Sequence, residues 1–518
     1  MLTNEILNSL KQYTANMQNQ ITLVLETGEH EKRAELHDFL TKLSSVSENI
    51  KFEERDTGGR LRSPICFLIE ADGKDTGIRF SGLPGGHEFN SLVLAILHSS
   101  GTDMKLDDSI LKIISNINEE LNFQVYVSLS CHNCPDVVQT LNKFALINDK
   151  ISTETIDGGV FPELIEENNI QGVPSVYLNG EVFANGKIDP AVLMDKLLQR
   201  NPEAINVSDD EKLPLQDMTI IGGGPAGVSA AIYGARKGLA ITIIADRFGG
   251  QVKDTMGIEN LISVSKTTGP ELTGALMAHM DDYTITRKEH LRVDRIEPGK
   301  IKKVHLSSGE VIETKTVIIA TGAKWRELGI PGEKENIGNG VAYCPHCDGP
   351  FYKGKDVAVI GGGNSGIEAA IDLSGIVNSV SVFEFLPELK ADQVLIEQAE
   401  SRDNITIYKN VAAQEILANG SGVEAIQYQD RESGDVLTKD LNGVFVQIGL
   451  LPNSEFVKGL VDQSEYGEIL INERGETSEE GIFACGDVTT VPYKQIVIAM
   501  GEGSKASLSA FDYLIREF

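Results

Sequence analysis

Two glycine-rich turns constrain the fold of this chain more than any other feature. Each follows an apolar, strand-like run and opens a stretch with helical periodicity, in DMTIIGGGPAGVSAAIYG and in KDVAVIGGGNSGIEAAID. In the pattern G-x-G-x-x-G, the first glycine allows the tight turn, the second lets a pyrophosphate approach, and the third lets the helix pack closely. The helix N-terminus then faces the phosphates. We therefore predict two Rossmann-like dinucleotide-binding units, with glycines at Gly222, Gly224 and Gly227, and at Gly361, Gly363 and Gly366.

An acidic residue follows each unit's next predicted strand. Asp246 ends AITIIAD, and Glu384 ends SVSVFE. A carboxylate at this position accepts hydrogen bonds from ribose hydroxyls and repels a 2′-phosphate, and no arginine cluster follows Glu384. Two such turns predict FAD plus a nicotinamide, and Glu384 favours NADH over NADPH. The alternative is two Rossmann units that bind other ligands or none.

The first dinucleotide-binding unit is predicted to be discontinuous. The segments TVIIATGAKWREL and GIFACGDVTT are strand–turn patterns typical of flavin sites, and the second lies near the C-terminus. We expect an FAD domain at 216–328 and 450–518, interrupted by an NADH domain at 329–449.

The first 200 residues form two similar units. In the second, QVYVSL is a strand pattern that runs into the amphipathic stretch SCHNCPDVVQTLNKFAL. ISTETI, a hairpin turning at Asn179-Gly180, and a helix after Asp189-Pro190 complete a thioredoxin-like order. Residues 1–100 repeat this order without a Cys-x-x-Cys pair, so we expect a redox-silent unit before an active unit at 101–200. A polar, Pro-punctuated linker at 201–215 follows.

Charge and composition exclude several classes of function. The formal net charge of −30 argues against general nucleic-acid binding. No apolar run reaches membrane-spanning length and the N-terminus does not resemble a signal peptide, so we expect a cytoplasmic protein that binds no membrane. Six cysteines are too few for a secreted disulfide scaffold, and Cys66 and Cys485 lie in apolar runs that predict buried thiols.

The other four cysteines form two Cys-x-x-Cys pairs, Cys131/Cys134 and Cys344/Cys347. A pair at a helix N-terminus can close into a disulfide, and the helix dipole stabilises a thiolate. We expect Cys131 to be the exposed nucleophile, with Cys134 one turn inside the helix. His132 is either a stabiliser of that thiolate or an exposed spacer. The rival hypothesis, one zinc site from four cysteines, is disfavoured because the pairs belong to different domains; no metal is expected.

The motifs together resemble the low-molecular-weight thioredoxin reductase family. They include GGQ at 249–251, ATG at 320–322, CPHCDG at 344–349 and CGDV at 485–488. With the double thioredoxin-like N-terminus and SCHNCPD, the whole chain is similar to the flavoprotein F subunits of alkyl hydroperoxide reductases. The implied fold class is α/β: tandem thioredoxin-like folds followed by two Rossmann-like domains, the FAD domain being discontinuous.

The resemblance implies roles for individual residues. Cys347 would take electrons from reduced FAD, Cys344 would exchange with Cys131/Cys134, and Asp348 is either the proton-handling acid or a plain surface acid. Pro174 would follow a cis bond, and Glu88 is either a proton acceptor or an exposed helix-start acid. The segments around FAD supply Gly222, Gly224, Pro225, Ala226, Gly227, Asp246, Gly250, Gln251, Asn260, Thr321, Gly322, Asp487 and Gln495. The NADH site would contain Gly361, Gly363, Asn364, Ser365, Gly366 and Glu384.

These features predict an NADH-dependent reductase of a peroxiredoxin partner, which removes hydroperoxides. The resemblance also implies a homodimer. Because NADH and Cys347 both need the flavin, we expect the NADH domain to rotate between half-reactions. The alternatives are a hydrogen-peroxide-forming NADH oxidase, a thioredoxin-reductase-like enzyme with another disulfide substrate, and a docking platform made of the first 200 residues.

Overall fold

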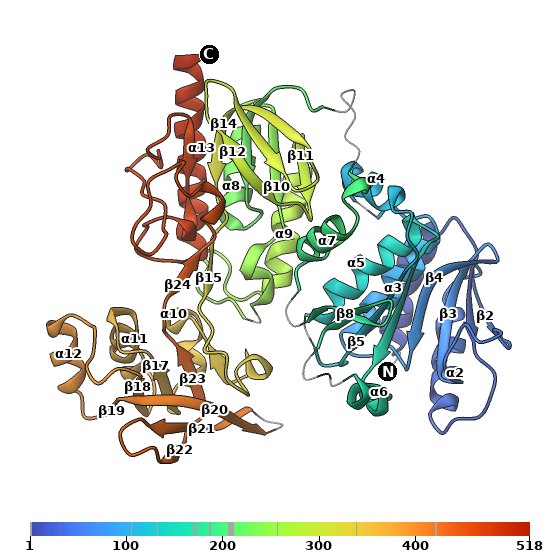
Figure 1. Ribbon diagram of the computed structural model, residues 1–518, viewed down its shortest axis with the longest axis horizontal. Helices are drawn as coiled ribbons and strands as arrows, with labels where there is room; N and C mark the ends of the chain where they lie inside the picture. The colour runs from blue at the N-terminus through green and yellow to red at the C-terminus, as the bar shows by residue number, and fades with distance from the viewer. Residues whose placement is uncertain are drawn as a thin grey trace.

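The computed structural model describes residues 3–518 except 105, 132, 169, 171–172, 186–187, 206–211, 256, 338 and 420–421. For Asn4, His346 and Cys347 it describes the backbone alone. Figure 1 shows an N-terminal module beside two further domains that lie one beyond the other. None of the described helices is long and apolar enough to cross a membrane.

The N-terminal module is built on one eight-stranded sheet rather than on two separate sheets. The strand order is β2-β1-β3-β4-β6-β5-β7-β8, and β4 joins β6 in parallel with Ile78 opposite Thr153. The strands are β1 (Ile21–Leu25), β2 (Ile50–Glu54), β3 (Cys66–Ala71), β4 (Lys74–Ser81), β5 (Leu121–Val127), β6 (Ile151–Asp157), β7 (Ser175–Leu178) and β8 (Glu181–Asn185). Because β4 and β6 share their backbone hydrogen bonds, the two predicted units form one rigid body.

The helices of this module place its cysteine pair. They are α1 (Asn4–Tyr13), α2 (Arg33–Ser44), α3 (Glu88–Ser99), α4 (Asp108–Asn116), α5 (Cys134–Ile147), α6 (Pro162–Glu167) and α7 (Pro190–Arg200). Helix α5 buries Val137, Leu141 and Phe144, whose spacing puts them on one helical face against the sheet. Its first residue is Cys134, and Pro135 suits the first turn, where no backbone N–H donor is needed.

The first Rossmann domain begins at Gln216. Its sheet order is β11-β10-β9-β14-β13-β12, with β25 also paired to β14. The strands are β9 (Gln216–Ile221), β10 (Ile241–Ala245), β11 (Ile285–Glu289), β12 (Val293–Glu297), β13 (Lys302–Leu306), β14 (Val311–Ile319) and β25 (Ile482–Ala484). The helices are α8 (Pro225–Ala235), α9 (Gly269–Asp281) and α13 (Ile496–Glu517), with 3-10 segments η4 (Gly250–Asp254), η7 (Glu455–Val457) and η8 (Gly486–Val488). Since β25 and α13 come from the C-terminal end, this domain is discontinuous in sequence.

The second Rossmann domain has a five-stranded parallel sheet in the order β16-β23-β17-β18-β19. Its strands are β16 (Val341–Ala342), β17 (Asp356–Ile360), β18 (Ser379–Glu384), β19 (Ile405–Lys409) and β23 (Gly443–Val446). A three-stranded sheet of β20 (Val411–Asn419), β21 (Gly422–Asp430) and β22 (Val436–Asp440) lies beside it. Its helices are α10 (Pro345–Asp348), α11 (Asn364–Ser374) and α12 (Gln393–Glu400), with 3-10 segments η5 (Lys334–Asn336) and η6 (Gly349–Tyr352).

A two-stranded ribbon connects the Rossmann domains. Strands β15 (Ala323–Trp325) and β24 (Leu450–Pro452) run antiparallel, with Lys324 opposite Leu451. The chain therefore enters and leaves the second domain through adjacent strands, which Figure 1 shows between the two sheets.

Candidate active site

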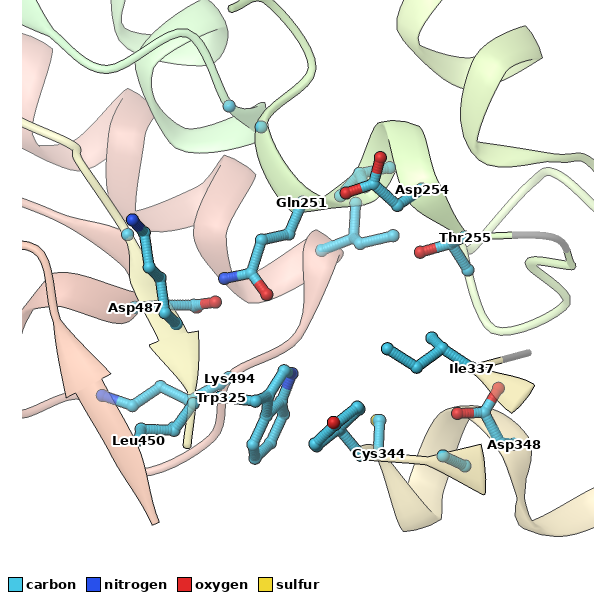
Figure 2. A pocket seen from close by; sticks show the side chains of 18 of the residues that line it. Gln251, Asp254, Thr255, Trp325, Ile337, Cys344, Asp348, Leu450, Asp487 and Lys494 are labelled. Carbon is cyan, nitrogen blue, oxygen red and sulfur yellow. The ribbon is translucent and has the colours of Figure 1, made fainter. Parts of the chain in front are cut away.

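A large cavity lies where the three parts of the chain meet. Its volume is about 1750 Å³, which exceeds the roughly 300–1,000 Å³ of ordinary small-molecule sites and suits a dinucleotide. Figure 2 shows Cys344 and Asp348 on one side of it, with Gln251, Asp254 and Thr255 opposite.

The first glycine turn has the shape that a dinucleotide requires. A Cβ atom on Gly222 would lie 2.2 Å from the Ala320 carbonyl oxygen, and one on Gly227 would lie 1.8 Å from that of Gly222. Those two glycines are therefore required by packing. Gly224 is different, because its φ of −76° suits any residue and no atom lies within 4 Å of a Cβ built on it. Its glycine keeps open the space through which a pyrophosphate would approach the N-terminus of α8, which no side chain caps.

The other predicted FAD residues converge on this cavity. Gly222, Gly224, Pro225, Ala226, Asp246, Gly250, Gln251, Asn260, Thr321, Gly322, Asp487 and Gln495 all line it. Gly227 does not, since its role is to bring α8 against the turn. FAD would thus be held by the glycine turn and α8 at its pyrophosphate, by Asp246 at its ribose, and by these side chains elsewhere.

Several of these side chains are fixed by hydrogen bonds from distant segments. Asn260 donates its amide to Gln495 at 3.1 Å, and the hydroxyl of Thr321 donates to the carbonyl of Asn453 at 2.7 Å. Asp246 forms an ion pair with Arg292 at 2.8 Å. Burial raises the pKa of Asp487, partly offset by the charge of Lys494. The cavity is therefore preorganised by contacts between its two chain segments.

The second glycine turn lies outside this cavity. None of its predicted contacts, Gly361, Gly363, Asn364, Ser365, Gly366 and Glu384, is among the residues that line it. Gly363 has the same open space as Gly224, at the uncapped N-terminus of α11. Glu384 is buried and accepts hydrogen bonds from the backbone N–H groups of Gly362 and Leu386. Glu384 therefore stabilises the turn, and its carboxylate can still accept hydrogen bonds from a ribose.

An arginine that the local sequence does not reveal lies beside this position. The Arg431 guanidinium stacks 3.8 Å from the centre of the Phe385 ring and donates to the Phe385 carbonyl at 2.7 Å. No arginine cluster follows Glu384 in the sequence, as expected. In the folded structure, however, Arg431 from the turn after β21 contacts Phe385, the residue next to Glu384.

The first cysteine of the second Rossmann domain's Cys-x-x-Cys motif faces the cavity. Cys344 lines it, is disulfide-bonded, and lies 3.9 Å from the Gln495 side-chain nitrogen. The side chain of Cys347 lies outside the described part of the structure. Asp348, which also lines the cavity, donates its backbone N–H to the Cys344 carbonyl at 3.0 Å. Burial raises the pKa of its carboxyl to about 6, so it can hold a proton next to the disulfide near neutral pH.

The second cysteine pair heads helix α5. Cys131 and Cys134 form a disulfide, and the Cys134 N–H donates to the Cys131 sulfur at 3.2 Å. Cys134 is fully buried, whereas Cys131 is half-buried rather than exposed, because it packs 3.8 Å from the Val173 carbonyl. The Val173–Pro174 bond is cis, as the family resemblance implies. His132 lies outside the described residues.

Glu88 is buried, so its interpretation as an exposed helix-start acid is wrong. It begins α3, which packs on α5 through a 3.3 Å hydrogen bond between Gln139 and Ser91. Burial raises the pKa of Glu88 to about 7; the nearby Ser91 hydroxyl lowers it and the Asp136 charge adds to the rise.

The N-terminal module docks directly at the rim of the cavity. Asp136, in the first turn of α5, forms an ion pair with Lys253 at 2.9 Å, and Lys253 lies in η4 between cavity residues. The helix that carries the Cys131–Cys134 disulfide is therefore anchored to the segment that carries Gln251.

Several lining residues were not predicted from the sequence. Trp325, Tyr343, Lys494, Arg247 and Arg292 all face the cavity. Lys494, Tyr343 and Arg247 stand next to predicted residues, and Trp325 lies within TVIIATGAKWREL, so these four could have been included. Arg292 belongs to a segment without a recognisable motif. Among the described residues, no three His, Cys, Asp or Glu side chains are placed to hold a metal ion.

Comparison with known proteins agrees with this geometry. Residues 216–503 match the model of the pyridine nucleotide-disulphide oxidoreductase family, and 121–199 match a thioredoxin domain. The F subunit of alkyl hydroperoxide reductase of Escherichia coli (strain K12) is 46% identical over 520 residues, which cover 100% of this chain and 99% of that protein. The chain belongs to the family of alkyl hydroperoxide reductase F subunits.

Other relatives carry a second name. The F subunit of Staphylococcus aureus (strain N315) is 48% identical over the full length of both chains, and a "NADH dehydrogenase" of Bacillus subtilis (strain 168) is 47% identical over the same extent. Among solved structures, thioredoxin reductase from Streptococcus pyogenes matches with a TM-score of 0.56 and 36% identity, covering 58% of this chain and 99% of its own.

Family membership confirms the predicted fold class and the resemblance. The chain is a mixed α/β flavoprotein of the disulfide oxidoreductase class, with FAD and a nicotinamide as its cofactors. The cavity, the open position at Gly224 and the adjacent disulfide fit that class residue by residue.

Proposed function

We propose that this chain is an NADH-dependent reductase of a peroxiredoxin disulfide, supporting the removal of hydroperoxides. One observation carries the proposal: Cys344 lines the cavity that fits FAD, while the helix with the Cys131–Cys134 disulfide is anchored at its rim through Asp136 and Lys253. Two redox pairs arranged around one flavin site suit a relay toward another protein.

The relay consists of two balanced thiol–disulfide exchanges. FAD, when bound, supplies two electrons taken as hydride from a nicotinamide. The reduced pair Cys344/Cys347 then attacks the Cys131–Cys134 disulfide; Cys344 and Cys347 close again as Cys131 and Cys134 become thiols. Cys131, the less buried sulfur, attacks the partner's disulfide in the same manner, and Cys134 resolves the mixed disulfide. Each exchange moves two electrons and leaves the donor pair oxidised.

Two buried acids are placed to manage the accompanying protons. Asp348 adjoins the Cys344 disulfide, and Glu88 stands at the start of the helix packed on α5. With pKa values raised to about 6 and about 7, both can hold or release a proton near neutrality.

NADH is the proposed donor rather than NADPH. Glu384 occupies the ribose position and would repel a 2′-phosphate, while the Arg431 side chain is engaged with the Phe385 ring and carbonyl. The rotation of the second Rossmann domain is also proposed, because its Cys344 lines the cavity while its glycine turn does not. Strands β15 and β24 are the natural pivot.

A homodimer and a cytoplasmic location complete the proposal. Exposed apolar side chains on the first Rossmann domain include Tyr466, Leu470, Tyr493 and Val497, and an ion pair of 3.0 Å between Lys494 and Glu468 ties their segments together. We propose that these side chains contribute to a contact between two copies of the chain. Two Cys-x-x-Cys pairs kept for exchange suit the reducing cytoplasm.

Stopped-flow absorbance tests the proposed activity. Under anaerobic conditions, about three equivalents of NADH should reduce the two internal disulfides and then FAD, after which the flavin band stays bleached. It should recover when an oxidised peroxiredoxin is added, and a Cys131→Ser variant should bleach normally but lose this recovery. Equal recovery in wild type and variant would contradict the relay.

A relative named NADH dehydrogenase supports oxidation of NADH by this chain, and we propose direct transfer to oxygen as a second activity. This reaction needs no cysteine, so the Cys131→Ser variant should keep its aerobic NADH turnover. That outcome separates an oxidase side activity from the disulfide relay.

A further inference from the structure

Two arginines of the first Rossmann domain each bridge a carboxylate of that domain and one of the N-terminal module. Arg292 lies 2.8 Å from Asp246 and 3.2 Å from Asp195 in α7. Arg247 lies 2.9 Å from Asp254 and 3.4 Å from Asp189, the residue before α7. Figure 1 places α7 next to this domain, beside α9 and β10.

These bridges belong to the wall of the flavin cavity. Arg247, Arg292, Asp246 and Asp254 line it, and so do Asn185 and Asp189 of the N-terminal module. Asp246 marks the adenosine end of the cavity, because the acid after the second Rossmann strand takes the ribose hydroxyls. The module therefore supplies part of the wall at that end.

Apolar contacts extend the same boundary. The buried core of the module is contiguous with Ile221, Ile244 and Leu291, which also line the cavity. Moving the module away would remove Asn185 and Asp189 from the wall and open the adenosine end to water.

A second group of ion pairs, located away from the cavity, also joins the module to the first Rossmann domain. Lys288 lies 3.2 Å from Asp107 at the start of α4 and 2.9 Å from Glu310, and their side chains are only 8%, 7% and 9% exposed. None of these three residues lines the cavity. Asp107 is the carboxylate that the module contributes, so removing its charge breaks the ion pair between the module and Lys288 and weakens docking, while the Lys288–Glu310 pair stays in place.

We propose that the docked N-terminal module is part of the FAD-binding site: Asn185 and Asp189 close the adenosine end of the cavity, so module docking and FAD retention stabilise each other. A coupling between two equilibria is reciprocal, so bound FAD favours docking by the same factor. When the module undocks to reach a partner protein, FAD is then bound less tightly. The ion pairs between the module and the first Rossmann domain limit how long the undocked state lasts.

The rate of FAD dissociation from the full-length holoenzyme tests this proposal. It is followed by the rise of flavin fluorescence after dilution. An Asp107→Asn variant should release FAD about threefold to tenfold faster, although Asp107 lies outside the cavity, because docking is weakened. Asparagine caps a helix as well as aspartate, so α4 should be preserved. Asp189→Asn should show a similar increase.

A matched control is Asp38→Asn, which removes an exposed ion pair with Lys42 inside the same module. It should release FAD at the wild-type rate. A stronger variant, Asp107→Lys, places like charges together and should increase the radius of gyration measured by X-ray scattering. If the module is displaced in this variant but FAD leaves at the wild-type rate, the linkage is refuted. Unchanged scattering would also overturn the proposal, since these pairs are then not what holds the module.

Discussion

Gly224 and Gly363 show how a single residue can indicate a ligand-binding site. Both have ordinary backbone angles, and neither has an atom within 4 Å of a built Cβ, so nothing in the protein requires glycine there. Both stand at uncapped helix N-termini, where phosphate oxygens would occupy that space.

Replacing Gly224 with alanine should therefore weaken FAD binding without disturbing the fold. We expect at least a tenfold rise in the FAD dissociation constant, about 1.4 kcal/mol, in a titration of the apoprotein. Gly274→Ala in α9, where a Cβ also meets nothing, is the matched control and should bind FAD normally. Unchanged affinity in Gly224→Ala would show that the pyrophosphate does not approach this turn.

Asp348 should control the pH dependence of electron transfer to the cavity disulfide. Its raised pKa, about 6, means that it is protonated below that pH and charged above it. If it donates a proton to a leaving thiolate, flavin reoxidation by the disulfide should slow as pH rises through 6. Asp348→Asn should be roughly 100-fold slower and lack this pH step in stopped-flow measurements. The exposed Glu368→Gln should behave as wild type, and a retained step in Asp348→Asn would assign it to another group.

At this scale, twelve of the thirteen residues that the sequence predicts around FAD line the cavity, because the glycine turns and short motifs are local. The prediction missed Arg247 and Tyr343, which adjoin predicted residues, and Arg292, which reaches the cavity only through folding. It also left open whether Glu88 and Asp348 are surface acids, since burial depends on packing from other elements.

Individual strands and turns could be predicted from their local sequence patterns, but the pairing between strands could not. The expected strand QVYVSL corresponds to β5, ISTETI to β6, and the turn at Asn179-Gly180 joins β7 to β8. Alternation and turn residues are sufficient for such assignments. The parallel pairing of β4 with β6 could not be predicted, since it depends on residues more than 70 positions apart that carry no matching signal.

The packing of α3 on α5 buries Glu88 and thereby raises its pKa. Its pKa is raised from 4.5 to about 7, so the folded state binds the proton more tightly than the unfolded chain. The contribution of Glu88 to folding stability is then greatest below pH 4.5 and falls as pH rises through 7. Above pH 7 the penalty is on the order of 3 kcal/mol.

A Glu88→Gln variant should remove that penalty. Near pH 4.5 its module should melt close to wild type, whereas at pH 8 it should melt several degrees higher, as scanning calorimetry would measure. The shift should vanish if the pKa of Glu88 is not raised in the folded protein, and an equal difference at both pH values would contradict its burial as the cause.

At the scale of the whole molecule, the arrangement joins one flavin cavity to two cysteine pairs on separate domains. Ion pairs between distant residues, such as Asp136 with Lys253 and Asp107 with Lys288, anchor the N-terminal module. The sequence predicted a separate module from the linker at 201–215. Its docked position could not be predicted, because isolated charges do not identify their partners.

Electrons are proposed to pass through Cys344 before they reach Cys131 and Cys134, and trapping of thiols after reduction tests this order. Wild-type protein and a Cys344→Ser variant would be mixed anaerobically with NADH, quenched with an alkylating reagent and analysed by mass spectrometry. We predict that Cys131 and Cys134 become alkylated in the wild type but remain a disulfide in Cys344→Ser, although its flavin is still reduced. Equal alkylation of Cys131 and Cys134 in both proteins would show that electrons reach them without Cys344 and would contradict the proposed relay.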